Sequence, residues 1–478
     1  MKRTKIVCTI GPASESKATL VKMMRAGMDV ARLNFSHGSY DSHKLIIANI
    51  RAAAKQVGKT VAIMQDLQGP RIRVGEVHRD GIELLRGEAV VFIPQSFINY
   101  RLLITGKEKI IPLGYEQLYK FTKPGKHVLI NDGLIDVEVQ KVKDKFIYGK
   151  VVKSGMIFSH KGINLPGVTI AADVITTKDK EDLKFGLSQQ IDFVALSFVK
   201  DASNVLTLKK LIGSKPVQII SKIERKEGLD NFDEILAVSD GIMVARGDLG
   251  IEIKPADVPL AQKEIIQKCL YAGKPVIVAT QMLESMVLNP RPTRAEVSDV
   301  ANAVIDHTDA VMLSGESAFG KYPVESVAMM ADIVHKTEQS RYDDVPLHYL
   351  KLKHASIEDA ISVVADDLAG QQLVKAIVVH SVSGHAARMI ARHRQEKPVI
   401  ALTNRASTKQ QLALSWGVQT LLIPTCRTLD QLIQTTSKAL LKAKLIKTGE
   451  YIVLVTGQPV GKIGGSNLVK LHRVWSNI

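Results

Sequence analysis

Eight short apolar runs, each followed by an interval with helical periodicity, constrain the fold of this chain more than any other feature. The pattern predicts strands at residues 5–10, 29–33, 61–65, 192–197, 217–221, 241–245, 275–279 and 310–313. The intervals are long enough for crossover helices, as at 16–26, 42–57, 178–187, 202–211 and 260–271. Eight β-then-α units predict a closed (β/α)8 TIM barrel of the α/β class. An open doubly wound sheet is the alternative.

Charged and polar residues follow several of these strands. They lie at 32–38, 65–70, 222–224, 246–250, 280–281 and 314–316. Lys222 and Glu224 are two residues apart at a strand end, so their side chains should share a face. For this stretch alone an ordinary ion pair is the alternative. Because the C-terminal ends of barrel strands meet at one rim, the full set predicts an active site there.

Residues 71–168 interrupt the β/α period between the third and fourth strands. Their β-type runs, at 89–93, 127–130, 134–139 and 146–152, are separated by Gly, Asp, Asn and Pro turns. We predict a small inserted all-β domain, a β-barrel, joined to the barrel at 69–70 and 165–167. Its expected role is a lid that closes over the rim and excludes water.

The pattern changes again after residue 340. A helical segment at 357–368 precedes strands at 376–379, 399–402, 420–423 and 451–455. We therefore expect three domains: a catalytic barrel (1–70 and 169–340), the lid (71–168) and a C-terminal α/β regulatory domain (341–478). The loop holding Ser381, Ser383, Gly384 and His385 could present backbone N–H groups and hydroxyls to a phosphate. A plain helix N-cap is the alternative.

Composition limits the possible partners. The formal net charge is +16, but Lys and Arg are dispersed without a basic tail or an aromatic-basic motif. This favours attraction of small phosphorylated anions over nucleic acid. No apolar run approaches the length of a membrane span. The three cysteines lack metal-ligand spacing, which fits a cytoplasmic protein.

The rim residues suit phosphoryl chemistry. Glu224 and Asp248 offer hard oxygen ligands for Mg²⁺ or Mn²⁺. Arg32 and Arg73 can grip a phosphoryl group, and Lys222 can neutralise charge that develops during transfer. The main-chain N–H groups of Gly247 and Asp248 could hold a substrate carboxylate. The sequence has no Walker-type loop, so a nucleotide would be held in another way, under the lid.

These motifs resemble those of the pyruvate kinase family over essentially the whole chain. The family signature is similar to residues 217–229, and further agreement covers Arg32-Leu-Asn-Phe-Ser-His-Gly, Asp66-Leu-Gln-Gly-Pro, Lys161-Gly-Ile-Asn-Leu-Pro-Gly, Ala245-Arg-Gly-Asp-Leu-Gly, Thr280-Gln-Met-Leu-Glu-Ser-Met, Pro290-Arg-Pro-Thr-Arg-Ala-Glu and Met312-Leu-Ser-Gly-Glu-Ser. The resemblance implies a homotetrameric phosphotransferase that moves a phosphoryl group from phosphoenolpyruvate to ADP, the last step of glycolysis.

The resemblance also implies roles for individual residues. Lys222 would stabilise the phosphoryl transition state and the enolate, and Glu224 and Asp248 would hold the divalent metal. Gly247, Asp248 and Thr280 would contact the substrate carboxylate, and Thr280 with Ser314 would belong to a proton relay. Residues 290–303 would lie near a subunit interface. Arg32 and Arg73 would hold the phosphoryl group, and the nucleotide would be bordered by Asn34, Phe35, Ser36, His37, Arg73 and Lys161.

Two departures from the family pattern carry further expectations. Members that need K⁺ bind it near positions matching Asn34, Ser36, Asp66 and 67, typically with Thr at 67 and Glu at 71, where this chain has Leu67 and Arg71. The Arg71 guanidinium could replace the cation, so we expect K⁺ to be dispensable. The effector loop often ends Gly-Arg in relatives but reads Gly384-His385 here. A monophosphorylated sugar or nucleotide is therefore the expected effector, rather than fructose bisphosphate.

Two other functions compete with this interpretation. Another phosphoenolpyruvate-using barrel enzyme would share the metal site and the arginines that hold the phosphoryl group. This interpretation would not account for the β insertion with Lys161. A basic nucleic-acid-binding protein would need clustered basic faces and salt-dependent binding.

Overall fold

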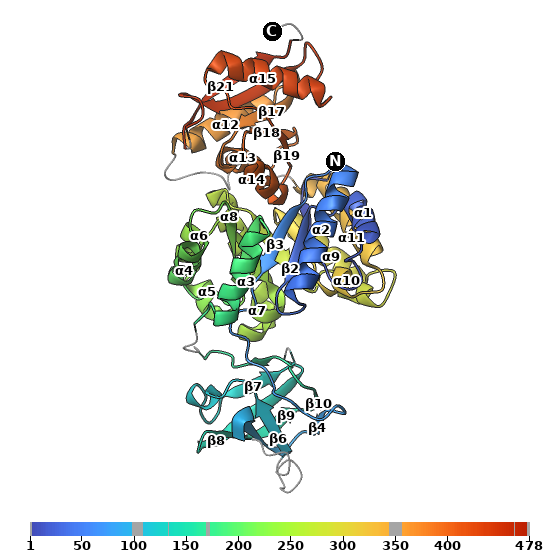
Figure 1. The fold of residues 1–478 in the computed structure, drawn as a ribbon, viewed down its shortest axis with the longest axis vertical. Helices are drawn as coiled ribbons and strands as arrows, with labels where there is room; N and C mark the ends of the chain where they lie inside the picture. The colour runs from blue at the N-terminus through green and yellow to red at the C-terminus, as the bar shows by residue number, and fades with distance from the viewer. Residues whose placement is uncertain are drawn as a thin grey trace.

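Three bodies follow one another along the long axis of the molecule: a C-terminal domain, a barrel and a β domain (Figure 1). The computed structural model describes residues 2–97, 109–131, 133–168, 173–343, 356–462 and 464–475. The expected α/β fold class is confirmed. None of the helices in these ranges has the length and apolar character needed to cross a bilayer.

The central body is a closed barrel of eight parallel strands in the order β1-β16-β15-β14-β13-β12-β3-β2. This confirms the barrel and excludes the open doubly wound sheet. The strand nearest the proposed site extends two residues further than the sequence suggested, so Lys222 lies within it. The strands are β1 (Lys5–Thr9), β2 (Val30–Asn34), β3 (Ala62–Asp66), β12 (Phe193–Leu196), β13 (Gln218–Ile223), β14 (Gly241–Ala245), β15 (Val276–Ala279) and β16 (Ala310–Leu313).

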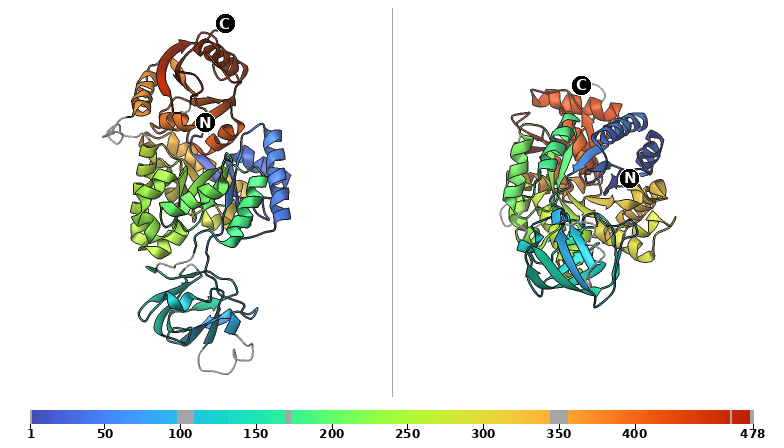
Figure 2. Two further views of the ribbon diagram at one scale, coloured as in Figure 1. Left: turned by 60° about the vertical axis from the view of Figure 1, so that its left-hand side comes forward. Right: turned by 60° about the horizontal axis from the view of Figure 1, so that its bottom comes forward.

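Helices surround the barrel, as the views in Figures 1 and 2 show. Local caps fix where several begin: Ser39, Thr176 and Thr293 each form a capping box at the start of a helix. The main outer helices are α1 (Lys17–Ala26), α2 (Tyr40–Val57), α3 (Thr177–Ser188), α4 (Ala202–Ile212), α6 (Phe232–Val238), α8 (Val258–Ala272), α9 (Arg294–Ile305) and α11 (Pro323–Glu338). Short helices α5 (Lys226–Asp230), α7 (Arg246–Glu252) and α10 (Gly315–Ala318) follow three strands at the rim.

Four aspartates, of which Asp240 is half-buried and the others are buried, secure the opposite, N-terminal end of the barrel. Asp29, Asp192, Asp240 and Asp309 each precede a strand and accept a hydrogen bond from a neighbouring backbone N–H, those of Ile6, Ile63, Ile219 and Val276 respectively. Because the pairing repeats around the barrel, it supports this end independently of the chemistry at the rim.

The inserted domain is all-β, as predicted, and has its own apolar core around Phe92 and Val137. A six-stranded sheet has the order β11-β7-β8-β9-β5-β6, and β10 pairs separately with β4. The strands are β4 (Ile82–Leu84), β5 (Ala89–Pro94), β6 (Lys109–Leu113), β7 (His127–Ile130), β8 (Ile135–Lys143), β9 (Phe146–Lys153), β10 (Gly155–Ile157) and β11 (Ile163–Asn164).

The C-terminal domain is an open five-stranded sheet in the order β19-β18-β17-β20-β21. Sequence periodicity predicted four of its strands and missed β21, which is antiparallel to β20. Its elements are α12 (Ile357–Ala369), β17 (Val374–His380), α13 (His385–Ala391), β18 (Val399–Thr403), α14 (Ala406–Gln411), β19 (Val418–Leu422), α15 (Leu429–Lys442), β20 (Tyr451–Gly457) and β21 (Ser466–Arg473).

Candidate active site

Lys222 lies at the centre of a buried polar cluster at the barrel rim. Its ammonium is 2.9 Å from Glu224 Oε1 and 3.1 Å from Asp66 Oδ1, and it donates to Ser197 Oγ at 2.8 Å. Burial alone would lower the pKa of Lys222, but Asp66 and Glu224 more than offset that effect and hold the pKa above its ordinary value. The ammonium therefore stays charged, fixed by three acceptors. The shared face predicted for Lys222 and Glu224 is present.

The Glu224 carboxylate fits a divalent metal ligand. Its side chain is 1 % exposed, and burial together with the like charge of Asp248 raises its pKa despite Lys222. A cation shared with Asp248 would relieve both effects. The described parts of the chain contain no group of three or more His, Cys, Asp or Glu that could hold a metal. Two hard carboxylates leave most coordination positions for water and substrate oxygens, as Mg²⁺ prefers.

Asp66 and Arg32 extend the polar cluster along the rim from Lys222. Arg32 Nε donates to Asp66 Oδ2 at 2.7 Å, and its Nη1 donates to Thr9 Oγ1 at 2.8 Å. Burial would raise the pKa of Asp66, but Arg32 and Lys222 hold it below the ordinary value. The 9 % exposed Arg32 is therefore held in one orientation at the rim.

Thr280 is held in a strained backbone conformation beside the start of α7. Its φ of 72° is rare for a β-branched residue. The Thr280 Oγ1 accepts the Gly247 N–H at 2.8 Å and donates to Ala279 O at 2.6 Å. Arg246 Nη2 also donates to Thr280 O at 2.8 Å. Strained backbone that is held by several hydrogen bonds is common at functional sites. The bond from Gly247 places it next to Thr280, as predicted.

A cleft of about 610 Å³ lies between the rim and the β domain. His37, Arg73, Lys161 and Asp248 line it, so side chains of both domains face one space. The pKa of His37 is lowered by burial and then by the nearby Arg73, Arg71 and Arg32. Positive charge is therefore concentrated where a polyphosphate would have to bind.

Comparison with known proteins decides the family. The family description "Pyruvate kinase, barrel domain" matches residues 1–327, and "Pyruvate kinase, alpha/beta domain" matches residues 359–472. The pyruvate kinase of Geobacillus stearothermophilus is 46 % identical over 477 residues, which cover 98 % of this chain and 80 % of that protein. The pyruvate kinase of Agrobacterium vitis is 43 % identical, with 98 % of each chain covered.

The chain belongs to the pyruvate kinase family.

A solved structure agrees with this assignment. The crystal structure of a pyruvate kinase from Cryptosporidium parvum has a TM-score of 0.90 and 38 % sequence identity, and covers 99 % of this chain and 96 % of that chain. The enzyme is accordingly a phosphotransferase of the pyruvate kinase family. The alternative from sequence, another phosphoenolpyruvate-using barrel enzyme, is not favoured.

Two of the residues that the pyruvate kinase resemblance assigned to the site have other surroundings. The Phe35 ring is 3 % exposed in the barrel core and stacks on His43 at 4.1 Å between centroids. Its side chain is thus structural, and only its backbone could border a nucleotide. The Ser314 N–H donates to Glu316 Oε2 at 2.8 Å, whereas Ser314 Oγ is buried and has no hydrogen-bond partner.

A second, small cavity of about 30 Å³ adjoins Lys222. It is lined by the four residues that matched the K⁺ position of other pyruvate kinases, Asn34, Ser36, Asp66 and Leu67, together with Arg71 and Lys222. The Asn34 Oδ1 is engaged by the Ser36 N–H at 3.1 Å. Arg71 therefore borders this cavity, while its Nη2 atom faces Asp248 Oδ1 at 3.6 Å.

Sequence reasoning missed two residues of the site, Ser197 and Phe198, and the contact of Arg71 with Asp248. Ser197 bonds both Lys222 and Asp66, the Phe198 N–H donates to Glu224 Oε2 at 2.7 Å, and Arg71 Nη2 is 3.6 Å from Asp248 Oδ1. Ser197 and Phe198 directly follow β12. That strand end could have been examined like the other strand ends of the predicted barrel, because the barrel places them all on one rim.

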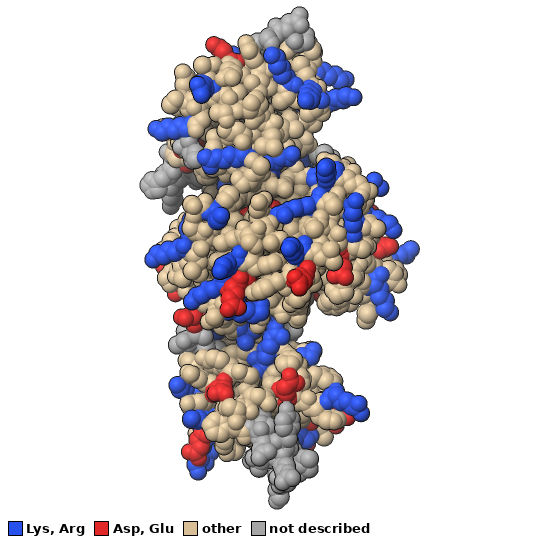
Figure 3. All heavy atoms as spheres, viewed as in Figure 1, with Lys and Arg blue, Asp and Glu red and all other residues tan. Residues whose placement is uncertain are grey.

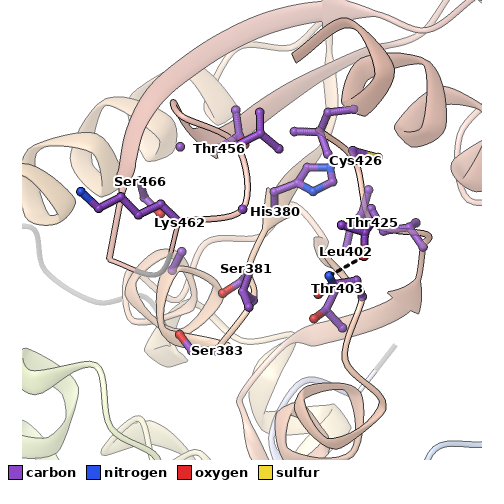
Figure 4. Close-up of a pocket in the computed structure, with 18 of the residues that line it drawn as sticks. His380, Ser381, Ser383, Leu402, Thr403, Thr425, Cys426, Thr456, Lys462 and Ser466 are labelled. Atoms are coloured by element: carbon purple, nitrogen blue, oxygen red, sulfur yellow. Dashed lines mark hydrogen bonds between the residues drawn. The ribbon is translucent and has the colours of Figure 1, made fainter. Parts of the chain in front are cut away.

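The predicted effector loop lines a cavity of about 80 Å³ in the C-terminal domain. Figure 4 shows Ser381, Ser383, Thr403 and Lys462 around it: the two serines follow β17, Thr403 ends β18 and Lys462 follows β20. Gly384, the N-cap residue of α13, has a φ of 84°. The Ser383 Oγ accepts the His385 N–H at 3.4 Å, so the helix-cap alternative still accounts for Ser383.

Basic side chains are spread along the visible face of the molecule, including the waist between the barrel and the β domain (Figure 3). They do not gather into one broad patch on this face. The distribution agrees with the dispersed Lys and Arg of the sequence.

Proposed function

We propose that the rim transfers the phosphoryl group of phosphoenolpyruvate to ADP, giving pyruvate and ATP, with the residues above in defined roles. The observation that carries the assignment is the buried Lys222 ammonium held by Asp66, Glu224 and Ser197. A fixed cation in a low-dielectric site stabilises charge where it develops. The bond from phosphorus to the enol oxygen breaks while a terminal ADP oxygen bonds to phosphorus, and the enolate then takes a proton on carbon.

Each end of the substrate has a matching group. Arg32 and Arg73 hold the phosphoryl oxygens. The substrate carboxylate accepts from the Gly247 and Asp248 N–H groups and from the Thr280 hydroxyl, and it replaces the Gly247–Thr280 and Thr280–Ala279 hydrogen bonds of the substrate-free chain. Glu224 and Asp248 would hold Mg²⁺ or Mn²⁺, which polarises the substrate oxygens. Asn34, Ser36, His37, Arg73 and Lys161 border the nucleotide, with Phe35 contributing backbone alone. Ser314, whose buried Oγ has no hydrogen-bond partner among the described residues, would join Thr280 in proton delivery.

A coupled assay for ADP-dependent pyruvate formation tests the assignment. Lys222→Met should reduce turnover by roughly three orders of magnitude, because the transition-state charge loses its fixed counter-ion. Glu224→Gln should weaken Mn²⁺ binding in the absence of substrate. Full activity of the Lys222 variant, or unchanged Mn²⁺ binding in the Glu224 variant, contradicts the corresponding role.

The enzyme should not require K⁺, because Arg71 supplies positive charge beside the same small cavity as Asn34, Ser36 and Asp66. Activity in a buffer whose only monovalent cation is tetramethylammonium should equal that with added K⁺. A collapse in rate that K⁺ restores would contradict the proposal.

The C-terminal cavity suits an effector with a single phosphate. Of the described residues lining it, Lys462 alone carries a permanent positive charge, and Glu358 adds a negative one. Burial lowers the pKa of His380 to about 4, and burial with Arg388 also lowers the pKa of His385. Both imidazoles are therefore neutral at pH 7, so the cavity cannot neutralise two phosphates.

Velocity against phosphoenolpyruvate with a panel of effectors tests this cavity. Sugar monophosphates or nucleoside monophosphates should shift the curve, and fructose bisphosphate should not. Lys462→Gln should remove the response while leaving the effector-free curve unchanged. Identical curves for the whole panel would argue against any effector.

The remaining proposals concern organisation. Residues 71–168 act as the lid, and residues 341–478 act as the regulatory domain. The homotetramer is supported by apolar side chains left exposed on one chain, among them Leu288 at 64 % beside the 290–303 segment and Ile357 at 66 % on α12. Light scattering coupled to size exclusion should give four times the chain mass.

A further inference from the structure

The chain passes from the barrel to the lid near Arg71, the outgoing crossing, and starts back toward the barrel at Gly167 and Val168, the return crossing. Each crossing contacts a barrel residue that is, or lies close in sequence to, a proposed metal carboxylate. On the outgoing crossing, Arg71 Nη2 lies 3.6 Å from Asp248 Oδ1. On the return crossing, Arg225 Nη2 donates to Val168 O at 3.4 Å, and the Glu252 carboxylate accepts a hydrogen bond from the Gly167 N–H. Arg225 directly follows Glu224, and Glu252 ends the helix α7 that carries Asp248.

The two attachments differ in what a divalent cation would do to them. Arg225 and Glu252 are not metal ligands in the proposed site, and Arg225 is 7 % exposed. Asp248, in contrast, is a proposed ligand. A divalent cation bound to that carboxylate would repel the Arg71 guanidinium, whose Nη2 lies 3.6 Å from Asp248 Oδ1. The 41 % exposed Arg71 side chain has room to leave.

The backbone beside each attachment can absorb a rotation. Gly69, two residues before Arg71, has a φ of 67°, and Gly167 has a φ of 64°. Both lie in the left-handed region that glycine adopts without strain. Short segments with such residues are common hinges in domain closure.

We propose that Arg71 is a latch released by the metal. In the enzyme without divalent cation, Arg71 holds the outgoing crossing on Asp248, and a cation at Glu224 and Asp248 displaces it. The lid then turns about Gly167 and Val168, which Glu252 and Arg225 still hold. The released guanidinium remains beside the small cavity it already lines with Asn34 and Asp66. This inference rests on the proposed metal site and adds the lid as the element that senses its occupancy.

Mn²⁺ binding to the full-length enzyme without substrate tests the latch, with free Mn²⁺ measured by electron paramagnetic resonance. Arg71→Gln should lower the Mn²⁺ dissociation constant about 3- to 10-fold, because a competing cation is gone. Arg79→Gln is the matched control: it removes an arginine that is 89 % exposed on the same domain and should change nothing. An unchanged constant in Arg71→Gln overturns the latch. Asp248→Asn separates the two proposals, since Mn²⁺ binding that survives it overturns the metal site itself.

The position of the lid gives a second readout. The native cysteines Cys8, Cys269 and Cys426 are all buried, so spin labels can be directed to Lys143→Cys on the lid and Glu264→Cys on α8. Mg²⁺ should shift the distance distribution of the otherwise wild-type enzyme. In the Arg71→Gln background the Mg²⁺-free distribution should already resemble the shifted one. Equal Mg²⁺-induced shifts from the same starting distance in both backgrounds overturn the proposal.

Discussion

At the residue scale, Ser197 is the contact to Lys222 that sequence did not identify. Its hydroxyl accepts from the ammonium at 2.8 Å and donates to Leu67 O at 2.7 Å, so it orients a group that carries the proposed chemistry. A hydrogen bond to a charged group contributes about 1.5 kcal/mol or more. Ser197→Ala should therefore lower kcat roughly tenfold with little change in KM for phosphoenolpyruvate. Ser203→Ala, on exposed α4, is the control, and equal kcat values for the two variants would contradict the role.

Asp29 and Asp192 each precede a strand at the N-terminal end of the barrel, but their pKa values are shifted in opposite directions. Burial would raise the pKa of Asp29, but Lys2, Lys59 and Lys5 hold it well below its usual range. Burial raises the pKa of Asp192 to about 7, opposed by the Ile63 N–H and Arg51. Ionised Asp29 therefore stabilises the fold at every pH above its unfolded value of about 4. Ionised Asp192 destabilises it as the pH rises from about 4 through 7.

The matched substitutions should have opposite effects on melting temperature. Asp29→Asn should cost about 2–4 kcal/mol at pH 8, leaving two lysines unpaired, and the deficit should persist at pH 5. Asp192→Asn keeps a hydrogen-bond acceptor and removes the buried charge, so it should raise the melting temperature at pH 8 and raise it by less at pH 5. Calorimetry at the two pH values measures both. Parallel responses would show that the pKa directions are wrong.

At the element scale, the two lid crossings offer a comparison of glycines. A Cβ at Gly69 would lie 2.8 Å from the Phe198 ring, whereas a Cβ at Gly167 would meet nothing within 4 Å. Alanine at either position costs about 1–2 kcal/mol of backbone strain. At Gly69 it also pushes on Phe198, whose N–H binds Glu224. Gly69→Ala should thus weaken Mn²⁺ binding and reduce kcat several-fold beyond Gly167→Ala. Equal kcat values in the Gly69 and Gly167 variants would show that Gly69 does not influence the proposed metal site.

The elements also show how far sequence patterns reach. The apolar runs predicted all eight barrel strands, because parallel strands buried on both faces leave a strong signal. The edge strand β21 was missed, since Leu468 and Lys470 belong to a half-exposed run without a continuous apolar stretch. At the site, the pair Lys222 and Glu224 followed from spacing along one strand. The contacts of Arg71 with Asp248 and of Ser197 with Lys222 join residues that follow different strands. The distance between such residues does not follow from their spacing in the sequence.

At the scale of the whole molecule, the C-terminal domain closes the barrel end opposite the active site. Leu414, fully buried, packs with the apolar residues that fill the barrel interior. Around it, Arg394 Nη2 lies 3.2 Å from Asp309 Oδ2, the Trp416 N–H donates to Asp309 Oδ1 at 3.1 Å, and Lys5 Nζ donates to Val418 O at 3.1 Å. The C-terminal domain, which holds the proposed effector cavity, therefore packs directly on the barrel that carries the proposed active site.

Shortening the Leu414 side chain should make the C-terminal domain and the barrel unfold in separate transitions. Leu414→Ala should cost about 2–5 kcal/mol, the usual range for a buried leucine, and the loss should appear as a C-terminal transition that melts before the barrel in calorimetry. Leu422→Ala in the same domain, at a leucine that is 49 % exposed, should leave the melting profile unchanged. Because Leu414 belongs to the apolar cluster of the barrel interior and not to the polar cluster around Lys222, turnover at saturating substrate should persist in the Leu414 variant. A single cooperative transition at the wild-type temperature would show that the two domains melt as one unit without this contact.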